Sequence, residues 1–267
     1  MHPGMIAGSA LIGLLVGIFV GLTSIGGGLL FMPLLISVLG VPPIVAVGSD
    51  AVISCITKIG AGALHWYHGN VRWRLVLRLA SGSIPGAFLG VLALVRVREA
   101  CGSAVNDFVR VAVAVLLVVI PVLYLAGPFF LPANSSPGAP PKIRTEFGMT
   151  LIGFIAGLLV GATSIGAGSL ILIMLLILYG LPPAATVGTD IVHGVLLAGV
   201  TGLLQFNLLQ NVDLVLVASV LAGSVPGSII GVFLTRHLSS DHLKRILCAL
   251  LVVLGARMLW GIFNHAN

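Results

Sequence analysis

The sequence predicts an all-α polytopic membrane protein of two inverted-topology repeats, each with a broken or re-entrant helix pair followed by three transmembrane helices. The prediction rests on the apolar composition, on an internal repeat and on the placement of the few charges. Of the 267 residues, 58% are hydrophobic and 7% are charged, whereas a soluble domain carries about 25% charged residues. So few charges cannot cover a surface against water. This excludes a cytosolic globular enzyme, a disordered protein and a disulfide scaffold.

The internal repeat divides the chain into two halves. The segment Gly21-Leu-Thr-Ser-Ile-Gly-Gly-Gly28 returns 140 residues later as Gly161-Ala-Thr-Ser-Ile-Gly-Ala-Gly168, and 14 of the 30 positions across 21–50 are identical in 161–190. After a one-residue slip, Gly82-Ser-Ile-Pro-Gly86 matches Gly223-Ser-Val-Pro-Gly227, and both segments are expected to pack and kink helices. A period this long indicates two half-domains. They cover 1–126 and 147–267, and 127–146 forms a linker rich in Pro, Gly and Ser.

Each half shows the same order of apolar runs. A run of roughly 16 residues ends at the Thr-Ser-Ile-Gly motif, and a run of about 11 residues follows, up to Gly40 or Gly180. Both are shorter than the ~20 residues that a span needs, so we expect a re-entrant or broken pair that meets at a non-helical stretch. Whether the pair is re-entrant or spanning stays open. Three spans then follow in each half, over 44–66, 74–95 and 105–126, and over 184–206, 214–235 and 246–262.

The placement of the charges predicts orientation and partners. Basic residues lie in the short connections between apolar runs: Arg72, Arg74, Arg78, Arg96, Arg98, Lys142, Arg144, Arg236, Lys244 and Arg245. If both short runs enter and leave on one side, most of these connections share a face, which is the positive-inside pattern. The chain is then a multi-pass protein of the bacterial inner membrane with its N-terminus outside. Its partner is the lipid bilayer rather than nucleic acid, which requires a folded basic face with aromatics; a homo-oligomer stays open.

The duplicated motif predicts an anion site. A helix N-terminus presents unpaired N–H groups and about half a positive charge, and glycines let a ligand approach the backbone. Hydroxyls add donors, so two such ends meeting near the midplane would form one pocket for a small anionic substrate. In the alternative interpretation the glycines serve only close helix packing. The candidate substrate-binding residues are Thr23, Ser24, Ile25, Gly26, Gly27, Gly28, Thr163, Ser164, Ile165, Gly166 and Gly168.

Two equivalent carboxylates are candidate coupling groups. Asp50 and Asp190 each lie eight residues after a proline that is expected to start a helix, at Pro42 and Pro182. At a rise of 1.5 Å per residue, each carboxyl lies about 12 Å inside its segment. An ionisable group at that depth is a functional hypothesis by default, because a carboxyl that loads and unloads a proton would couple transport to a proton gradient. The alternative is a structural carboxylate that caps backbone or pairs with Lys58 or His193.

Other polar residues inside the apolar segments complete this set. Lys58 has Ala198 as its repeat counterpart, and it either pairs with Asp50, faces the substrate or snorkels. His193 shares a helix face with Asp190 and is either a proton relay or a hydrogen-bonded structural residue. His65 and Gln205 are equivalent and end their segments, so they are expected at the membrane interface. The candidate coupling residues are Ser49, Asp50, Lys58, Thr189, Asp190 and His193.

The motifs resemble the TauE/SafE family of membrane permeases, also described as sulfite exporters. The resemblance rests on Gly26-Gly-Gly-Leu-Leu-Phe-Met-Pro33 after Thr-Ser and on its second-half counterpart from Gly161. It implies secondary transport of small sulfur-containing anions such as sulfite or organosulfonates. It also implies a site at the Thr, Ser and Gly positions of the two motifs. The second motif departs from the pattern at Ala167 and Ile173, and Lys58 belongs to no motif of the family.

The resulting hypothesis is a secondary transporter of a small anion, sulfite or an organosulfur anion such as a sulfonate, that works by alternating access with proton coupling at Asp50 and Asp190. The isolated residues Cys55, Cys101 and Cys248 form no metal or cofactor motif, and no catalytic motif is present, so neither an enzyme nor a cofactor is expected. Two alternatives remain. One is a cation or neutral-solute permease with Asp50 and Asp190 as ligands. The other is an integral subunit of a larger complex or a membrane-embedded enzyme.

Overall fold

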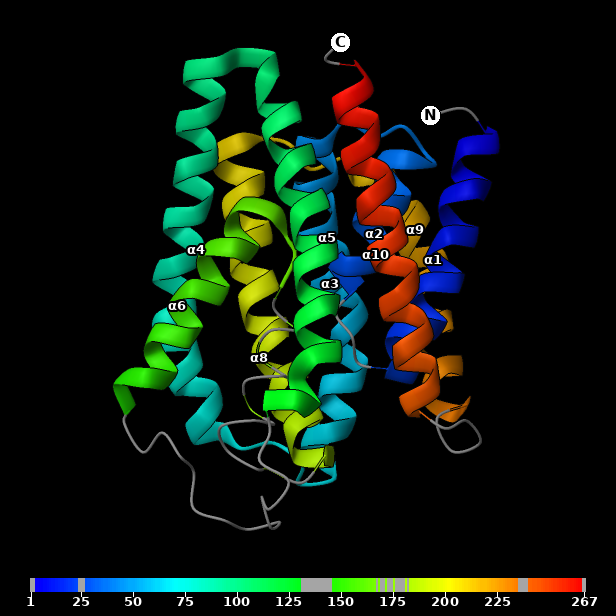
Figure 1. Cartoon of the computed structure of the whole chain (residues 1–267). Coiled ribbons are helices and arrows are strands. Elements are labelled where there is room, and N and C mark those ends of the chain that lie inside the picture. Colours follow the sequence, from blue (N-terminus) through cyan, green and yellow to red (C-terminus); the bar gives the residue numbers. More distant parts are fainter. Residues whose placement is uncertain are drawn as a thin grey trace.

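The protein is a bundle of helices (Figure 1). The computed structural model describes residues 3–23, 27–130, 146–166, 168, 171, 175, 181, 183–234 and 240–265. Within these ranges every regular element is helical, which confirms the predicted all-α class. The helices are α1 (Pro3–Thr23), α2 (Gly27–Ser37), α3 (Pro43–Tyr67), α4 (Trp73–Cys101), α5 (Val105–Phe130), α6 (Glu146–Thr163), α8 (Pro183–Leu204), α9 (Leu214–Leu234) and α10 (Ser240–His265), with a 3-10 turn over Gly102–Ala104 and a π-helical turn over Gln205–Leu209.

Several helices are long and apolar enough to cross a bilayer. Among the described residues these are four stretches, Pro43–Tyr67, Trp73–Leu123, Ala184–Leu209 and Leu214–Gly231, of which the second joins α4 to α5 through the 3-10 turn. Shorter apolar helices include Gly27–Ser37 and Cys248–Gly261. The chain is therefore a multi-pass membrane protein. The predicted spans agree with the helices to within a few residues, except that α4 runs on to Cys101 and α10 begins earlier, at Ser240.

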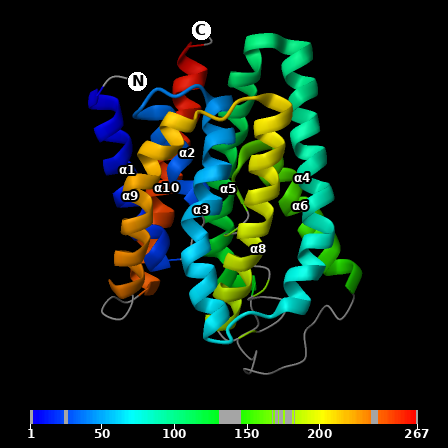
Figure 2. The same cartoon turned by 180° about the vertical axis from the view of Figure 1, so that it is seen from behind.

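The two halves interlock in the bundle. The closest helix pairs are α1 with α9, α4 with α6, α3 with α8, and α5 with α10, so each of these pairs joins one half to the other. In Figures 1 and 2, α3 starts at the end of the bundle where α1 begins and α10 ends, whereas α8 beside it runs the opposite way. This antiparallel course of equivalent helices fits inverted repeats, whose orientation across a membrane stays a prediction.

Glycines bring the helices of the two halves into backbone contact. A Cβ on Gly82 or Gly86 of α4 would collide with backbone of α6, at Thr150 and at Phe154. The same collision recurs at the repeat positions, where Gly223 and Gly227 of α9 meet the backbone of α1. Small residues permit such close approach where lipid offers no hydrophobic driving force between helices. The two Gly-Ser-x-Pro-Gly segments are thus packing elements, as the sequence predicts.

Each half also binds the connecting loop of the other half. Ser49 Oγ accepts a hydrogen bond from the backbone N–H of Asp213 at 3.0 Å. Thr189 Oγ1 accepts one from the backbone N–H of Arg72 at 3.1 Å. These four residues are repeat equivalents in pairs, because Ser49 corresponds to Thr189 and Arg72 to Asp213. The hydroxyls next to the two candidate carboxylates therefore hold the opposite half in place.

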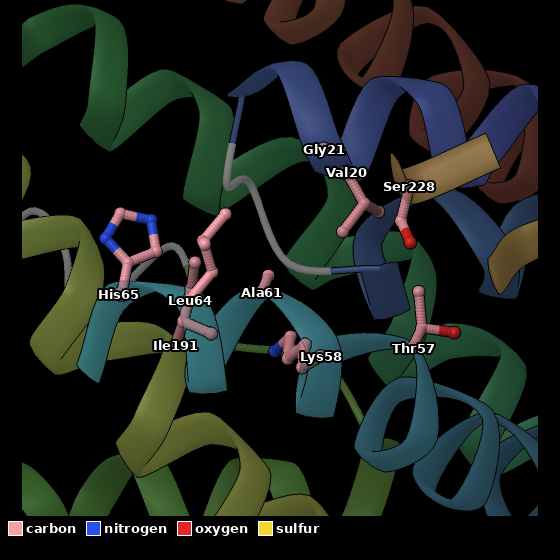
Figure 3. A pocket seen from close by; sticks show the side chains of 9 residues that line it. All are labelled: Val20, Gly21, Thr57, Lys58, Ala61, Leu64, His65, Ile191 and Ser228. Carbon is pink, nitrogen blue, oxygen red and sulfur yellow. The ribbon is translucent and has the colours of Figure 1, made fainter. Parts of the chain in front are cut away.

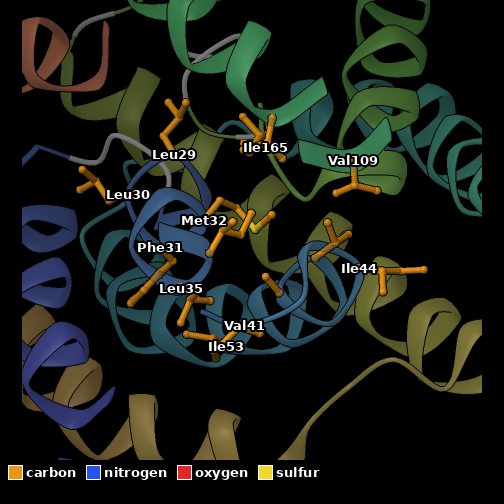
Figure 4. Close-up of a cluster of buried hydrophobic side chains, with 14 of the residues drawn as sticks. Leu29, Leu30, Phe31, Met32, Leu35, Val41, Ile44, Ile53, Val109 and Ile165 are labelled. Carbon is orange, nitrogen blue, oxygen red and sulfur yellow. The ribbon is translucent and has the colours of Figure 1, made fainter. Parts of the chain in front are cut away.

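The short helix α2 lies in the interior and centres the hydrophobic core (Figure 4). Phe31, Met32 and Leu35 of α2 are each 0% exposed, and they cluster with residues such as Ile53 of α3 and Val109 of α5. A helix that is apolar on all sides is buried on all sides. Since α2 is fixed within the core, it positions the glycines at its own N-terminus.

The glycine contacts between α4 and α6 predict a stability effect. In Gly157→Ala the new Cβ would lie 2.7 Å from the Cα of Ser83, so the helices must separate, and overpacking of this kind costs about 1–3 kcal/mol. We expect the melting temperature of the detergent-solubilised protein to fall by about 2–10 °C. Gly60→Ala on α3 is the matched control, because a Cβ there meets nothing within 4 Å. Equal melting temperatures for the two variants would contradict the packing account.

Candidate functional site

Each Thr-Ser-Ile-Gly motif begins at the last residue of a helix. Thr23 is the last residue of α1, and Gly27 and Gly28 open α2. Ser24, Ile25 and Gly26 lie outside the described residues. In the second half Thr163 ends α6, and Ser164, Ile165 and Gly166 follow as a non-helical stretch. Thr163, Ser164, Ile165, Gly166 and Gly168 are all buried.

The two motifs are in direct contact. A Cβ built on Gly28 would lie 2.5 Å from the carbonyl oxygen of Ser164 and 2.9 Å from Oδ2 of Asp50. Only glycine leaves room for this approach of α2 to the break after α6. Residues 136 positions apart in sequence, Gly28 and Ser164, therefore meet beside one of the two candidate carboxylates. The role of these residues in anion binding stays a prediction.

The break after α6 is held by its own side chains. Thr163 Oγ1 donates to the Leu159 carbonyl at 2.7 Å and accepts the backbone N–H of Ile165 at 3.3 Å. Ser164 has a left-handed backbone with φ of 58°, and Gly166 has φ of 116°. A non-glycine residue in this region is uncommon and is a pointer to function. Here the unusual backbone turns the Ser164 side chain toward Asp50.

Asp50 is the acceptor at the centre of the contact. Its side chain is 0% exposed. Oδ2 accepts a hydrogen bond from Ser164 Oγ at 2.7 Å, and Oδ1 accepts one from Ser54 Oγ at 3.4 Å. Hydroxyl donors offset part of the cost of burying a carboxylate. The bond from Ser164 also ties α3 of the first half to the broken segment of the second half.

Asp190 occupies the equivalent position with different surroundings. It is 1% exposed, and its Oδ1 has no hydrogen-bond partner among the described residues. One turn later on α8, His193 is 0% exposed; its Nε2 is 2.8 Å from Ser83 Oγ, and its Nδ1 also lacks a partner in the described part of the chain. Orphaned buried polar atoms are few in proteins and indicate strain or function. The bond to Ser83 fits the structural alternative for His193, while its free nitrogen keeps the relay hypothesis open.

Lys58 is a buried cation. Its side chain is 6% exposed, and it makes no hydrogen bond and no ion pair within 4.0 Å to any residue that the structure describes. Its ammonium lies against α8, because a Cβ on Gly194 would be 3.0 Å from Nζ. It acts electrostatically on both Asp50 and Asp190. In this structure Lys58 thus forms no direct ion pair with Asp50 among the described residues, and its role, including that of a substrate-facing cation, stays a prediction.

A small cavity opens beside Lys58 (Figure 3). Its volume is about 50 Å³. The residues that define it come from four helices: Gly21 of α1, Thr57, Lys58 and His65 of α3, Ile191 of α8 and Ser228 of α9. His65 Nδ1 is buried and has no hydrogen-bond partner among the described residues. The cavity thus combines an unpaired ammonium with an unpaired ring nitrogen, and it begins at the glycine that opens the first motif.

Three buried polar contacts were missed at the sequence level. Thr57 Oγ1 lies 3.0 Å from Ser224 Oγ of α9. Gln205 is 0% exposed, donates to the Gly161 carbonyl at 2.9 Å and accepts a hydrogen bond from Asn211 at 2.9 Å. The expectation that Gln205 anchors at the membrane interface is wrong, because Gln205 continues the buried face that Ala198 and Thr201 form on α8. The Asn-Val pair that recurs at 70 and 211 was the available signal, since both asparagines enter the opposite half.

Comparison with known proteins agrees with this architecture. The family model described as sulfite exporter TauE/SafE matches residues 9–258. A probable membrane transporter protein of Bacillus subtilis, YjnA, is 36% identical over 252 residues, which cover 93% of this chain and 98% of that protein. A probable membrane transporter protein of Xylella fastidiosa is 26% identical, with 92% of each chain covered. No solved structure matches the chain.

The buried amide contacts predict a second stability effect. Asn211 Nδ2 donates to the Ile44 carbonyl at 2.6 Å and to Gln205 Oε1 at 2.9 Å. Asn211→Ala leaves these buried acceptors without a donor, which costs about 1–3 kcal/mol, and thermal unfolding should shift to lower temperature. The control is Asn207→Ala, an exposed amide bonded only within its own helical turn, which should stay within about 0.5 kcal/mol of the parent protein. A larger loss in the control than in Asn211→Ala would refute this assignment.

Proposed function

Since the chain belongs to the TauE/SafE sulfite exporter family of membrane transporters, we propose that it carries a small anion, sulfite or an organosulfonate, by alternating access. In this proposal it lies in the bacterial inner membrane with its N-terminus outside and its two repeats inverted. Inverted repeats with broken helices at their interface are a recurrent plan of secondary transporters. Proton coupling through Asp50 and Asp190 is part of the proposal.

The contact of Gly28, Ser164 and Asp50 is the observation that carries the proposal. It brings a helix N-terminus of one half, a broken segment of the other half and an ionisable side chain to one buried point. Rocking of the halves would separate or close this contact, so the interface between the halves would open to each side in turn. The N-terminus of α2 supplies a positive dipole end without a full charge.

The balance of charges around Lys58 supports proton coupling. Two carboxylates, Asp50 and Asp190, act on this one ammonium. With both carboxylates ionised the cluster carries a net negative charge and repels an anion. A proton taken up by either carboxylate removes that repulsion, so anion entry and proton uptake favour each other. The unpartnered Oδ1 of Asp190 leaves an atom free to receive a proton.

The cation permease is the weaker of the two transport hypotheses. It needs Asp50 and Asp190 as ligands, but the hydroxyls of Ser54 and Ser164 already occupy the Asp50 carboxylate. A cation would also meet the positive charge of Lys58, which is buried and interacts electrostatically with both carboxylates. Like charges repel more strongly where water is excluded.

Flux in proteoliposomes tests the proposed function. Sulfite uptake should exceed that of protein-free liposomes and should rise when the outside is made acidic. Asp50→Asn removes a titratable group, so sulfite should still bind while the acceleration by the pH gradient is largely lost. The control Asp107→Asn changes an exposed carboxylate on α5 and should keep both properties.

Two outcomes would contradict the proposal. Absence of sulfite and sulfonate movement, with or without a pH gradient, would reject anion transport. Complete loss of binding in Asp50→Asn, together with uptake of a cation by the parent protein, would instead support the cation permease.

A further inference from the structure

We infer that the transported anion binds in the Lys58 cavity, with the Lys58 ammonium as its cationic partner. The inference rests on the proposed function and adds to it the cation that pairs with the substrate. It depends on the charge, volume and asymmetry of the cavity between α1, α3, α8 and α9 (Figure 3).

The charge of the cavity calls for an anion. Lys58 is 6% exposed and has no hydrogen-bond or ion-pair partner in the described part of the chain. A buried charge is normally paired or solvated, and an ammonium offers three N–H donors. Val20, Ala61, Leu64 and Ile191 make the rest of the wall largely apolar, so they provide no counter-charge. An oxyanion in the cavity would supply the missing partner.

Lys58 is the donor of this wall. His65 lines the cavity about two helical turns along α3 from Lys58, but its Nδ1, which has no partner among the described residues, is buried from a water-sized probe. Ser228 contributes no free proton, because its hydroxyl donates to the Val225 carbonyl at 2.8 Å. Among the lining residues, neither α1 nor α9 adds an ionisable side chain.

Other ionisable groups surround Lys58 outside the cavity. They are Asp50 and Cys55 on α3 and Asp190 and His193 on α8, each of which interacts electrostatically with it. The two carboxylates oppose anion binding when ionised. Binding at Lys58 therefore tightens as the medium becomes more acidic, which connects this cavity to the proton coupling proposed above.

The volume suits a small anion. The cavity measures about 50 Å³, and one water needs roughly 10–15 Å³ of such space. The space thus holds about four water-sized groups, as many as the sulfur and three oxygens of sulfite.

The cation of the cavity is not duplicated, although the scaffold is. The repeat counterparts of Thr57 and Lys58 are Leu197 and Ala198. The counterpart of His65 is Gln205, whose amide is engaged by the Gly161 carbonyl and by Asn211. The second half therefore has no ammonium at the position equivalent to Lys58.

Binding measurements on purified protein test the inference. Sulfite affinity is measured by calorimetry in detergent for the parent protein and for Lys58→Gln, which should bind at least tenfold more weakly. Arg74→Gln removes an exposed positive charge and should leave the affinity unchanged.

A second variant guards against misfolding of Lys58→Gln. Ala61→Leu keeps the ammonium but fills the cavity from α3, so it should abolish sulfite binding while the protein still elutes as a single species. Wild-type affinity in both variants would overturn the cavity assignment. If the parent protein neither binds nor transports sulfite, the proposed function itself fails; sulfite transport by the parent with unaltered binding in Lys58→Gln rejects only this inference.

Discussion

The hydrogen bond from the Ser164 hydroxyl to the Asp50 carboxylate joins the two halves of the protein at the point where the second half is broken. Backbone and side-chain polar groups inside a membrane must find partners within the protein, because lipid provides none. Thr163 accepts a hydrogen bond from the backbone of the broken segment, and Ser164 donates one to Asp50. Gly28 has no side chain, so both Ser164 and Asp50 can lie close to it. The two motifs, the N-terminus of α2 and the Asp50 carboxylate thus meet at this one contact.

Around that contact the helical scaffold is duplicated, whereas some of its buried polar side chains occur in one half alone. The glycine contacts between helices, the hydrogen bonds to the connecting loop of the opposite half and the buried aspartate recur in both halves. Lys58, by contrast, has Ala198 as its repeat counterpart, and the counterpart of His193 is Ile53. A duplicated scaffold permits the halves to exchange conformations during transport, as proposed here. The unpaired side chains of one half then determine what is bound.

Most of the fold could be predicted from the sequence because it depends on patterns along the chain. The lengths of the apolar runs predicted the helices, and the two Gly-Ser-x-Pro-Gly segments predicted that the helices pack closely there. The site was less predictable, because it depends on which helices become neighbours. The spacing of eight residues from Asp50 to Lys58 allows a shared helix face but places them about 12 Å apart along the axis, too far for a direct ion pair. The position of Gln205 was missed because a polar side chain at the end of an apolar run gives no sign of the buried partners, Gly161 and Asn211, that it meets in the fold.

The most direct test of the central claim, an anion bound beside Lys58 at the interface of the two halves, is an experimental density map. Crystals soaked with selenite, a heavier analogue of sulfite, would reveal its position by anomalous scattering. The account predicts a peak within hydrogen-bond distance of Lys58 Nζ, between α3 and α8. A peak elsewhere in the protein, or an unoccupied cavity in which Lys58 pairs with Asp50 or Asp190, would contradict it.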